Sequence, residues 1–202
     1  MKILVLGVTG MLGSAVFSRF SDDPAFETYG TLRGAAGLRH FDERHRNNLL
    51  TGVDVLDNDS LVMARVKPDV VINCVGLIKQ LADAKDPLAA LPVNAMLPHR
   101  LSRLCALASA RLIHVSTDCV FDGRKGMYLE SDPSDAEDLY GKSKYIGEVT
   151  SDVNAITLRT SIIGHELGSN VALVDWFLSQ PGPVKGFTRA VFSGLPTTEL
   201  AR

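Results

Sequence analysis

The sequence predicts an α/β fold in which helices cover both faces of a doubly wound parallel sheet. Short apolar runs of strand length alternate with segments whose apolar residues recur at helical spacing. In addition, a glycine-rich turn joins the first predicted strand to the first predicted helix. Because the crossovers between parallel strands are right-handed, this alternation builds one twisted sheet with two helical layers.

The first half of the chain is predicted to contain three strands and two helices. Ile3 to Leu6 is a continuous apolar run, as expected for a strand buried on both faces. Asp59 and Ser60 can cap the second helix, and Pro68 marks its end. In chain order, the predicted elements are strand 3–6, helix 11–20, strand 29–32, an irregular loop 34–48, helix 59–67 and strand 69–73.

The second half continues the alternation. A long helical pattern runs from Pro87 to Ala110, and we expect it to be bent or broken near Pro92 and Pro98. The remaining predicted elements are strand 112–116, helix 139–149, strand 155–159 and the beginning of a helix at 197–202.

The composition is that of a globular domain. With 202 residues, 46% hydrophobic residues and a net charge of −2, the chain is long enough for one domain and has no basic face for a nucleic acid polymer or a membrane. The apolar runs are too short to span a membrane and no signal peptide is evident, so we expect a cytoplasmic protein. Cys74, Cys105 and Cys119 are predicted to be reduced, and no histidine spacing predicts a metal site.

The glycine turn, Gly7 to Gly13, lies between a predicted strand and a predicted helix. Gly7 allows a tight turn, Gly10 lets the backbone approach a pyrophosphate, and Gly13 lets the helix pack closely on the sheet. The amides at the helix N-terminus would hold the phosphates. This pattern predicts a Rossmann-like dinucleotide site, with contacts from Gly7, Thr9, Gly10, Met11, Leu12 and Gly13.

Arg33 indicates which dinucleotide is bound. Folds that bind NAD place a carboxylate at the end of the second strand to hold the ribose 2′-hydroxyl. Here the strand ends in Thr31-Leu32-Arg33, and a guanidinium there suits a 2′-phosphate. The sequence therefore predicts NADPH as the cofactor, with NADH as the alternative.

Tyr140 and Lys144 lie one helical turn apart, so their side chains project from one face. A nearby ammonium stabilises a phenolate and lowers the pKa of a tyrosine, which then can protonate a carbonyl oxygen as a hydride reaches the carbon. The hydroxyl of Thr117, at the end of the strand before this helix, can hydrogen-bond the same oxygen. Glycine turn, hydroxyl and Tyr/Lys helix occur in the order that short-chain dehydrogenase/reductases require.

On these residues the chain resembles the extended short-chain dehydrogenase/reductases, in the dTDP-4-dehydrorhamnose reductase-like, sugar nucleotide-binding branch. The most specific segment is Ser116 to Gly123, followed by Tyr140 to Lys144 and Gly147-Glu148. Asn73 to Gly76, Val93 to Ala95 and Leu158 to Ser161 support it.

The resemblance implies a role for several positions. Gly10, Met11 and Leu12 would contact the pyrophosphate. Further cofactor contacts would come from Asp54 and Val55 at the adenine, from Cys74, Val75 and Gly76 at the nicotinamide ribose, and from Thr160, Tyr140 and Lys144. Thr117, Tyr140 and Lys144 would be catalytic, with Tyr140 as proton donor, and Thr117, Asp118 and Cys119 would contact the substrate. Where this chain has Cys119, family members often have Tyr.

The resemblance also implies a function: NADPH-dependent reduction of a nucleotide-linked 4-keto-6-deoxy sugar, with hydride transfer to C4. The alternatives are a nucleotide-sugar 4-epimerase or dehydratase and a non-catalytic regulatory subunit that binds the cofactor. Residues 1–160 would form the NADP-binding domain, and residues 161–202 the start of a substrate-binding lobe that is incomplete compared with such reductases. A nucleotide-sugar is the expected ligand, and a homodimer is one expected assembly.

Overall fold

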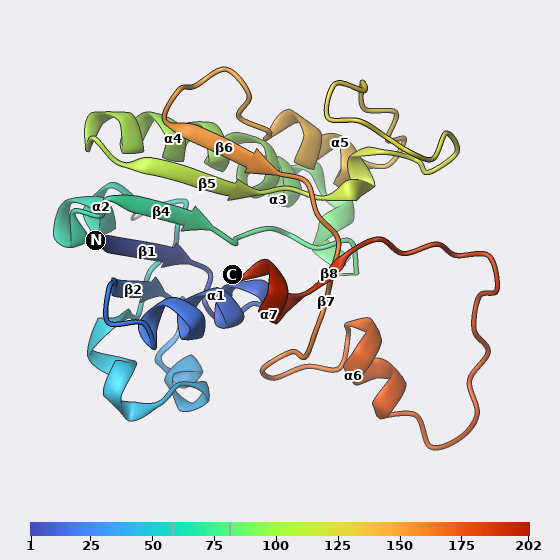
Figure 1. Ribbon diagram of the computed structural model, residues 1–202, viewed down its shortest axis with the longest axis horizontal. Helices are drawn as coiled ribbons and strands as arrows, with labels where there is room; N and C mark the ends of the chain where they lie inside the picture. Colours follow the sequence, from blue (N-terminus) through green and yellow to red (C-terminus); the bar gives the residue numbers. More distant parts are fainter. Residues whose placement is uncertain (58, 81) are drawn as a thin grey trace.

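The computed structural model describes residues 1–57, 59–80 and 82–202. Six parallel strands form one sheet in the order β3-β2-β1-β4-β5-β6, which confirms the predicted doubly wound architecture (Figure 1). The strands are β1 (Lys2–Leu6), β2 (Glu27–Thr31), β3 (Leu49–Leu50), β4 (Val70–Asn73), β5 (Arg111–Val115) and β6 (Ala155–Leu158).

The strand order reverses beside β1. From β1 the chain proceeds outward to β2 and β3, and then returns to β4 on the other side of β1. Leu4 of β1 pairs with Tyr29 on one side and with Val71 on the other. In sheets of this kind, ligands bind beyond the carboxyl ends of the strands at such a reversal.

The central strand β1 supplies buried side chains to both faces of the sheet. Leu4 and Leu6 pack in a cluster with α2 (Asp59–Val66) and α4 (Leu97–Leu107), whereas Ile3 and Val5 pack with α1 (Met11–Ser21) on the opposite face. This alternation follows from the two-residue period of a strand. It explains why Ile3–Leu6 is apolar at every position.

Where the sequence predicts a bend or break in the long helix, the structure shows a change of helical geometry without a break. The segment consists of α3 (Pro87–Ala90), a π-helical stretch (Leu91–Met96) and α4. Pro92 lies in the π-helical stretch, and Pro98 is the second residue of α4, directly after that stretch. The helix therefore continues through both prolines with a local widening.

Several element boundaries differ from the sequence prediction. β2 begins two residues earlier, at Glu27, because it pairs along the whole of β1. Helix α5 (Leu139–Ile146) ends before Gly147, three residues earlier than expected. The two-residue strand β3 and the short helix α6 (Leu173–Leu178) were not predicted, because neither is long enough to show a period. The loop at 34–48 contains two 3₁₀ turns.

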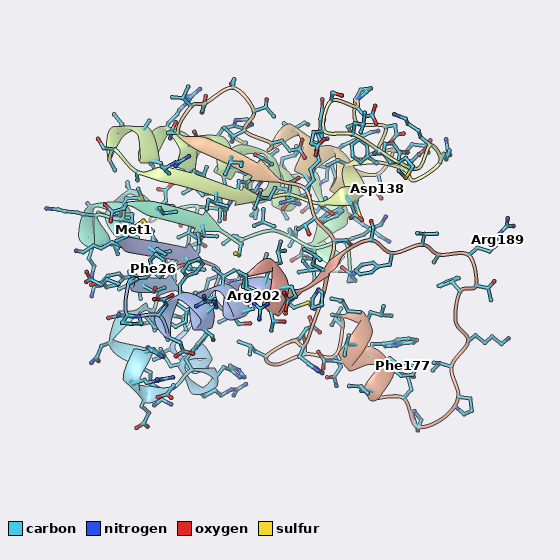
Figure 2. The ribbon with its side chains drawn as sticks, in the orientation of Figure 1. Met1, Phe26, Asp138, Phe177, Arg189 and Arg202 are labelled. Atoms are coloured by element: carbon cyan, nitrogen blue, oxygen red, sulfur yellow. The ribbon has the colours of Figure 1, made fainter. Side chains whose placement is uncertain are left out.

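Residues 161–202 leave the sheet and return to it. β7 (Ile162–Ile163) pairs in parallel with β8 (Leu195–Pro196), and α7 (Thr197–Leu200) packs against α1, where Ala201 joins the core. Between β7 and β8 the chain makes a wide excursion that carries α6 (Figure 1). Phe177 lies on α6, and Arg189 lies at the outer turn of this excursion (Figure 2). In the described residues, we find no helix with the length and apolarity needed to cross a membrane.

Candidate active site

The glycine turn has the backbone geometry that its sequence predicts. Gly7 has φ +80°, in the left-handed region that favours glycine, and its carbonyl oxygen accepts a hydrogen bond from the Gly10 amide at 3.0 Å. A Cβ atom on Gly13 would overlap that carbonyl oxygen and lie 2.9 Å from the Gly7 carbon. Gly13 is therefore the point at which α1 packs directly on the turn.

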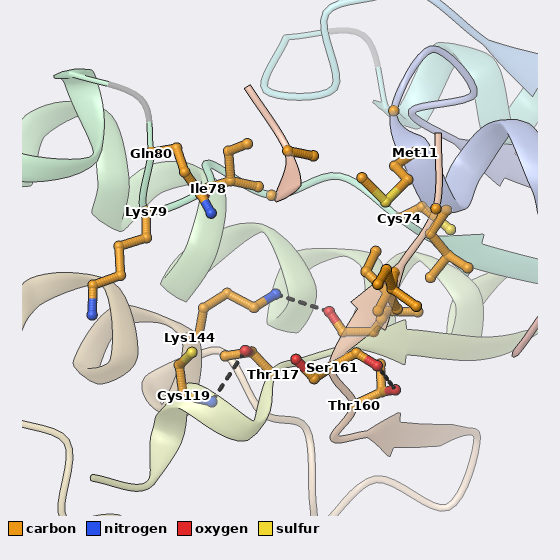
Figure 3. A pocket seen from close by; sticks show the side chains of 18 of the residues that line it. Met11, Cys74, Ile78, Lys79, Gln80, Thr117, Cys119, Lys144, Thr160 and Ser161 are labelled. Carbon is orange, nitrogen blue, oxygen red and sulfur yellow. Dashed lines mark hydrogen bonds between the residues drawn. The ribbon is translucent and has the colours of Figure 1, made fainter. Parts of the chain in front are cut away.

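A cavity of about 530 Å³ opens beside this turn, beyond the carboxyl ends of β1, β4 and β5. Its walls come from the start of α1, the segments after β4 and β5, α5, and the segment after β6. In Figure 3, Met11 and Cys74 lie on the glycine-turn side, and Lys144, Thr117 and Cys119 on the other. The predicted site residues that line the cavity are Gly10, Met11, Leu12, Cys74, Val75, Gly76, Thr117, Cys119, Tyr140, Lys144 and Thr160.

Thr117 and Tyr140 reach the cavity from neighbouring elements. Thr117 is buried and caps a short 3₁₀ turn, its hydroxyl oxygen accepting a hydrogen bond from the Cys119 amide at 3.1 Å. Tyr140 lies in the first turn of α5, which begins at the N-cap Asp138. The Asp138 carboxylate accepts from the Gly141 amide at 2.8 Å and pairs with Lys79 at 2.6 Å. This cap fixes the first turn of α5, and with it the backbone that carries Tyr140.

Lys144 lies one turn further along α5, with only 4% of the residue exposed. Its Nζ donates a hydrogen bond to the Val115 carbonyl oxygen at 2.8 Å. Burial lowers the pKa of Lys144 from 10.5 to about 8, against the opposing charge of Glu148. Lys144 therefore begins to lose its proton only slightly above physiological pH.

The pKa of Tyr140 is raised, which differs from the lowering expected from Lys144. Burial is the largest cause, and the nearby Thr117 hydroxyl acts in the opposite direction. The Lys144 ammonium is bound to the Val115 carbonyl oxygen, and it is not among the causes that shift the tyrosine. Tyr140 is thus held in the protonated form that a proton donor requires.

The three cysteines, Cys74, Cys105 and Cys119, are free thiols in this structure. Burial raises the pKa of both Cys74 and Cys105 to about 12, and it also raises the pKa of Cys119. Neutral thiols are poor nucleophiles and poor metal ligands. Among the described residues, no group of three or more histidine, cysteine or acidic side chains is placed to hold a metal ion.

Seven predicted site residues do not line the cavity. Gly7 and Gly13 shape the turn beneath it, and Thr9 lies against the 3₁₀ turn after β2, close to Gly37. Arg33 is exposed at the end of the segment that follows β2, and the Gly52 amide donates to its carbonyl oxygen at 3.1 Å. The others are Asp54 and Val55, which follow this contact, and Asp118, an exposed residue next to Thr117.

Asn94 does not line the cavity but joins two segments that do. Its Oδ1 accepts from the Leu77 amide at 2.8 Å, and its Nδ2 donates to the Leu77 carbonyl oxygen at 3.1 Å and to the Ser143 hydroxyl at 3.2 Å. Asn94 thus joins the loop after β4 to α5 from within the π-helical stretch, a geometry that often occurs at functional sites. In the sequence, the Val93-Asn94-Ala95 motif of the resembled family was the signal that could have pointed to Asn94.

The far wall of the cavity comes from residues 161–202, which carried no predicted site residue. These residues are mainly apolar, and the acidic side chain among them, Glu166, accepts from the amides of Val171 and Ala172 at 2.8 Å each. The wall consists of Ser161, Ile162, Ile163, Gly164, Glu166, Ala172, Leu173, Val174 and Phe192.

Comparison with known proteins gives the same assignment as the motifs. A probable low-salt glycan biosynthesis reductase, Agl14 of Haloferax volcanii, is 32% identical over 182 residues, which are 87% of this chain and 58% of that protein. The subunit beta of methionine adenosyltransferase 2 from Mus musculus is 28% identical over 171 residues, 82% of this chain and 48% of that protein. The chain thus spans about half the length of these curated relatives.

A solved structure of dTDP-4-dehydrorhamnose reductase from Bacillus anthracis in complex with NADP has the same fold. It superimposes with a TM-score of 0.63 at 25% identity, covering 81% of this chain and 55% of that one. The RmlD substrate binding domain profile matches residues 1–178. The resemblance inferred from the motifs is therefore confirmed, and the chain belongs to the RmlD substrate binding domain family.

Proposed function

We propose that this chain carries the cofactor-binding and catalytic half of an NADPH-dependent reductase acting on a nucleotide-linked 4-keto-6-deoxy sugar. The observation that carries the proposal is one cavity lined both by the start of α1 after the glycine turn and by Thr117, Tyr140 and Lys144. Dinucleotide and carbonyl chemistry need these two sets of groups side by side. The relative crystallised with NADP supports the choice of cofactor.

The glycine turn fits a dinucleotide. Gly10 is the N-cap of α1 and has no side chain to occupy the space in front of the helix, where the first N–H groups lack intrahelical partners. Gly10, Met11 and Leu12 would hold the pyrophosphate, Cys74, Val75 and Gly76 would border the nicotinamide ribose, and Arg33 would bind the 2′-phosphate. When bound there, NADPH supplies a hydride to the carbonyl carbon of the substrate.

The chain's own residues manage the proton and the orientation. Thr117 donates a hydrogen bond to the substrate carbonyl oxygen and orients it. Tyr140 donates its phenolic proton to that oxygen, so that hydride and proton together convert the ketone to an alcohol. Lys144 stabilises the phenolate that remains on Tyr140 and holds the ribose hydroxyls.

Tyr140→Phe tests the mechanism, because it removes the proton donor and keeps the ring. NADPH affinity should be retained, while turnover of a confirmed substrate should fall by about 100-fold or more. Tyr145→Phe, at an exposed position of the same helix, is the matched control. Normal turnover in Tyr140→Phe would remove tyrosine from the mechanism.

Calorimetry on the 202-residue chain tests the cofactor and the substrate separately. We expect NADPH to bind and dTDP- and UDP-linked sugars to bind weakly, because the far wall of the cavity is apolar and offers few groups for a diphosphate. Tight binding of a nucleotide-sugar would show that the apolar far wall is sufficient to hold the substrate. Failure of NADPH to bind would refute the proposal. Net consumption of NADPH distinguishes a reductase from an epimerase or dehydratase, which regenerates its cofactor.

A regulatory subunit is the second candidate, favoured by the 28% identity to methionine adenosyltransferase 2 subunit beta. Exposed apolar side chains on the excursion, including Trp176 and Phe177 of α6, offer a surface for a partner. A partner enzyme that co-purifies in stoichiometric amount, combined with unchanged function in Tyr140→Phe, would favour this candidate over the reductase.

A further inference from the structure

Glu148 is a buried carboxylate just beyond the end of α5. Its side chain is 2% exposed, and its amide donates to the Tyr145 carbonyl oxygen at 3.1 Å. Removing a carboxylate from water is costly unless charged partners and hydrogen bonds compensate for the lost hydration. Glu148 lies outside the cavity, so contact with a ligand does not explain its burial.

Two side chains, each directly after a different strand, satisfy this carboxylate. Arg159, directly after β6, donates from Nε to both carboxylate oxygens at 2.9 and 3.1 Å and from NH2 to Oε2 at 2.7 Å. Ser116, directly after β5, donates its hydroxyl to Oε1 at 2.9 Å. Charge-assisted, forked contacts of this kind are among the strongest and most directional in proteins. The carboxylate therefore holds three chain segments together at one point.

Each of these segments leads directly to the candidate site. Ser116 precedes Thr117, Arg159 precedes Thr160, and both Thr117 and Thr160 line the cavity. Glu148 itself lies one turn after Lys144. A shift of the carboxylate would displace these cavity-lining groups relative to one another.

The charge of Glu148 also acts on Lys144. Glu148 is the larger of two groups that raise the pKa of Lys144 against burial, the other being Cys74. Other ionisable groups near this lysine are His114 on β5, whose pKa is lowered to about 3 chiefly by burial, and Tyr140 on α5. The Arg159 cation pairs with Glu148, and Tyr145 and Glu130 act in turn on Arg159. Cys74 and Tyr140 are neutral at pH 7 because their pKa values are raised. Glu148 is thus the anion that opposes the desolvation of this lysine.

We infer that Glu148 is a positioning residue, whose buried carboxylate fixes the segments carrying Thr117 and Thr160 against α5. Its negative charge, one helical turn from Lys144, also favours the ammonium form of that lysine. The inference deepens the proposed function, since it concerns the lysine assigned there to the ribose and the tyrosine. A purely structural role would require the hydrogen bonds of Glu148 and would leave the titration of Lys144 unchanged when an isosteric amide replaces the carboxylate.

The test is the titration of Lys144 itself, followed by NMR of the 13C-labelled lysine ε-carbons in the 202-residue protein and assigned with Lys144→Met. Glu148→Gln keeps the shape and an acceptor for Ser116 but removes the charge. In Glu148→Gln, the midpoint of the Lys144 titration should fall by about one pH unit. Glu137→Gln, which removes an exposed carboxylate, should leave the midpoint at the wild-type value. An unchanged midpoint in folded Glu148→Gln would overturn the inference.

Glu148→Asp provides the second variant, in case the amide does not fold. It retains the charge and withdraws the carboxylate by one methylene, so the Lys144 midpoint should fall between those of wild type and Glu148→Gln. A midpoint lower than that of wild type by about one pH unit or more, although the charge is retained, would contradict the inference. Because this measurement needs no cofactor, its failure is distinct from failure of the proposed function, which calorimetry with NADPH would reveal independently.

Discussion

At the scale of single residues, burial shifts the pKa values of two ionisable groups of the site in opposite directions. Burial raises the pKa of Tyr140 and lowers that of Lys144, since in each case the neutral form is favoured when water is removed. For the tyrosine this preserves the proton that the proposed mechanism requires it to donate. For the lysine it places deprotonation near the pH at which an enzyme works.

The cost of burying Lys144 should appear in the pH dependence of stability. The pKa is about 8 in the folded protein and 10.5 when unperturbed, so between these values the unfolded chain binds more protons and stability rises with pH. Below pH 8 the cost is fully present. Relative to Lys144→Met, wild type should gain on the order of 3 kcal/mol from pH 8 to 10.5. Urea unfolding of both proteins across this range measures the gain.

The matched control for this titration is Lys142→Met, which removes an exposed lysine from the same helix. It should follow the wild-type pH dependence. A constant stability difference between wild type and Lys144→Met at all pH values would show that the buried lysine does not titrate in this window.

Arg33 is the residue on which we propose that cofactor choice depends. Arg33→Ala should weaken NADPH binding by about 1.5–3 kcal/mol, the value of a charge-assisted contact to the 2′-phosphate, and leave NADH nearly unchanged. Fluorescence titration of both cofactors gives the ratio, with the exposed Arg19→Ala as control. Equal affinity of the wild type for the two cofactors would refute this role.

At the scale of elements, the site is formed by the ends of strands and the starts of helices. The glycine turn joins β1 to α1, and the N-cap Asp138 begins the helix that carries both Tyr140 and Lys144. The π-helical stretch before α4 places Asn94 between α5 and the loop after β4. Because regular elements hold these groups on several sides, small shifts of one element affect the whole cavity.

Gly13→Ala should show how closely α1 packs on the glycine turn. The new Cβ would overlap the Gly7 carbonyl oxygen, which is backbone and cannot rotate away. We expect the free energy of unfolding to fall by about 1–3 kcal/mol and NADPH to bind at least about tenfold more weakly, as α1 moves off the turn. Thermal unfolding and calorimetry measure both effects.

Gly182→Ala is the matched control for this substitution, because a Cβ there meets no atom within 4 Å. It should leave stability and NADPH affinity close to the wild-type values. If Gly13→Ala behaved in the same way, close packing of α1 on the turn would not be needed for either property.

At the scale of the whole molecule, two parts differ in how they are packed. Buried clusters cover both faces of the central strands of the sheet, whereas the excursion between β7 and β8 exposes many apolar side chains. Trp176, Phe177 and Phe187 are 41%, 55% and 93% exposed. α7 nevertheless returns to α1, so the end of the chain is anchored in the core through Ala201.

Limited trypsin digestion should reveal this difference. Lys185 and Arg189 are exposed in a stretch that lacks regular secondary structure, and such segments open at little cost in free energy. Mass spectrometry should identify the first cleavage at one of these two sites, before any cleavage within the six-stranded sheet. Replacing both with Gln should delay the first cut, and initial cleavage elsewhere with unchanged rate would contradict the prediction.

The sequence alone determined the features that depend on local patterns. The alternation of strands and helices predicted the parallel sheet. The spacing of apolar residues and the length of apolar runs can both be read within a few residues. The glycine spacing from Gly7 to Gly13 and the one-turn spacing of Tyr140 and Lys144 were likewise readable, and they led to most of the cavity-lining residues. Family membership followed from the same motifs.

Only the tertiary structure decided the features that depend on burial and on contacts between distant segments. The raised pKa of Tyr140 results from desolvation, which has no local pattern in the sequence. The pairing of Glu148 with Ser116 and Arg159 spans 32 and 11 residues. The apolar far wall and the return of α7 to α1 likewise arise when strands more than thirty residues apart pair as β7 and β8. Such contacts form only when the chain is folded, because burial and long-range proximity are properties of the packed molecule.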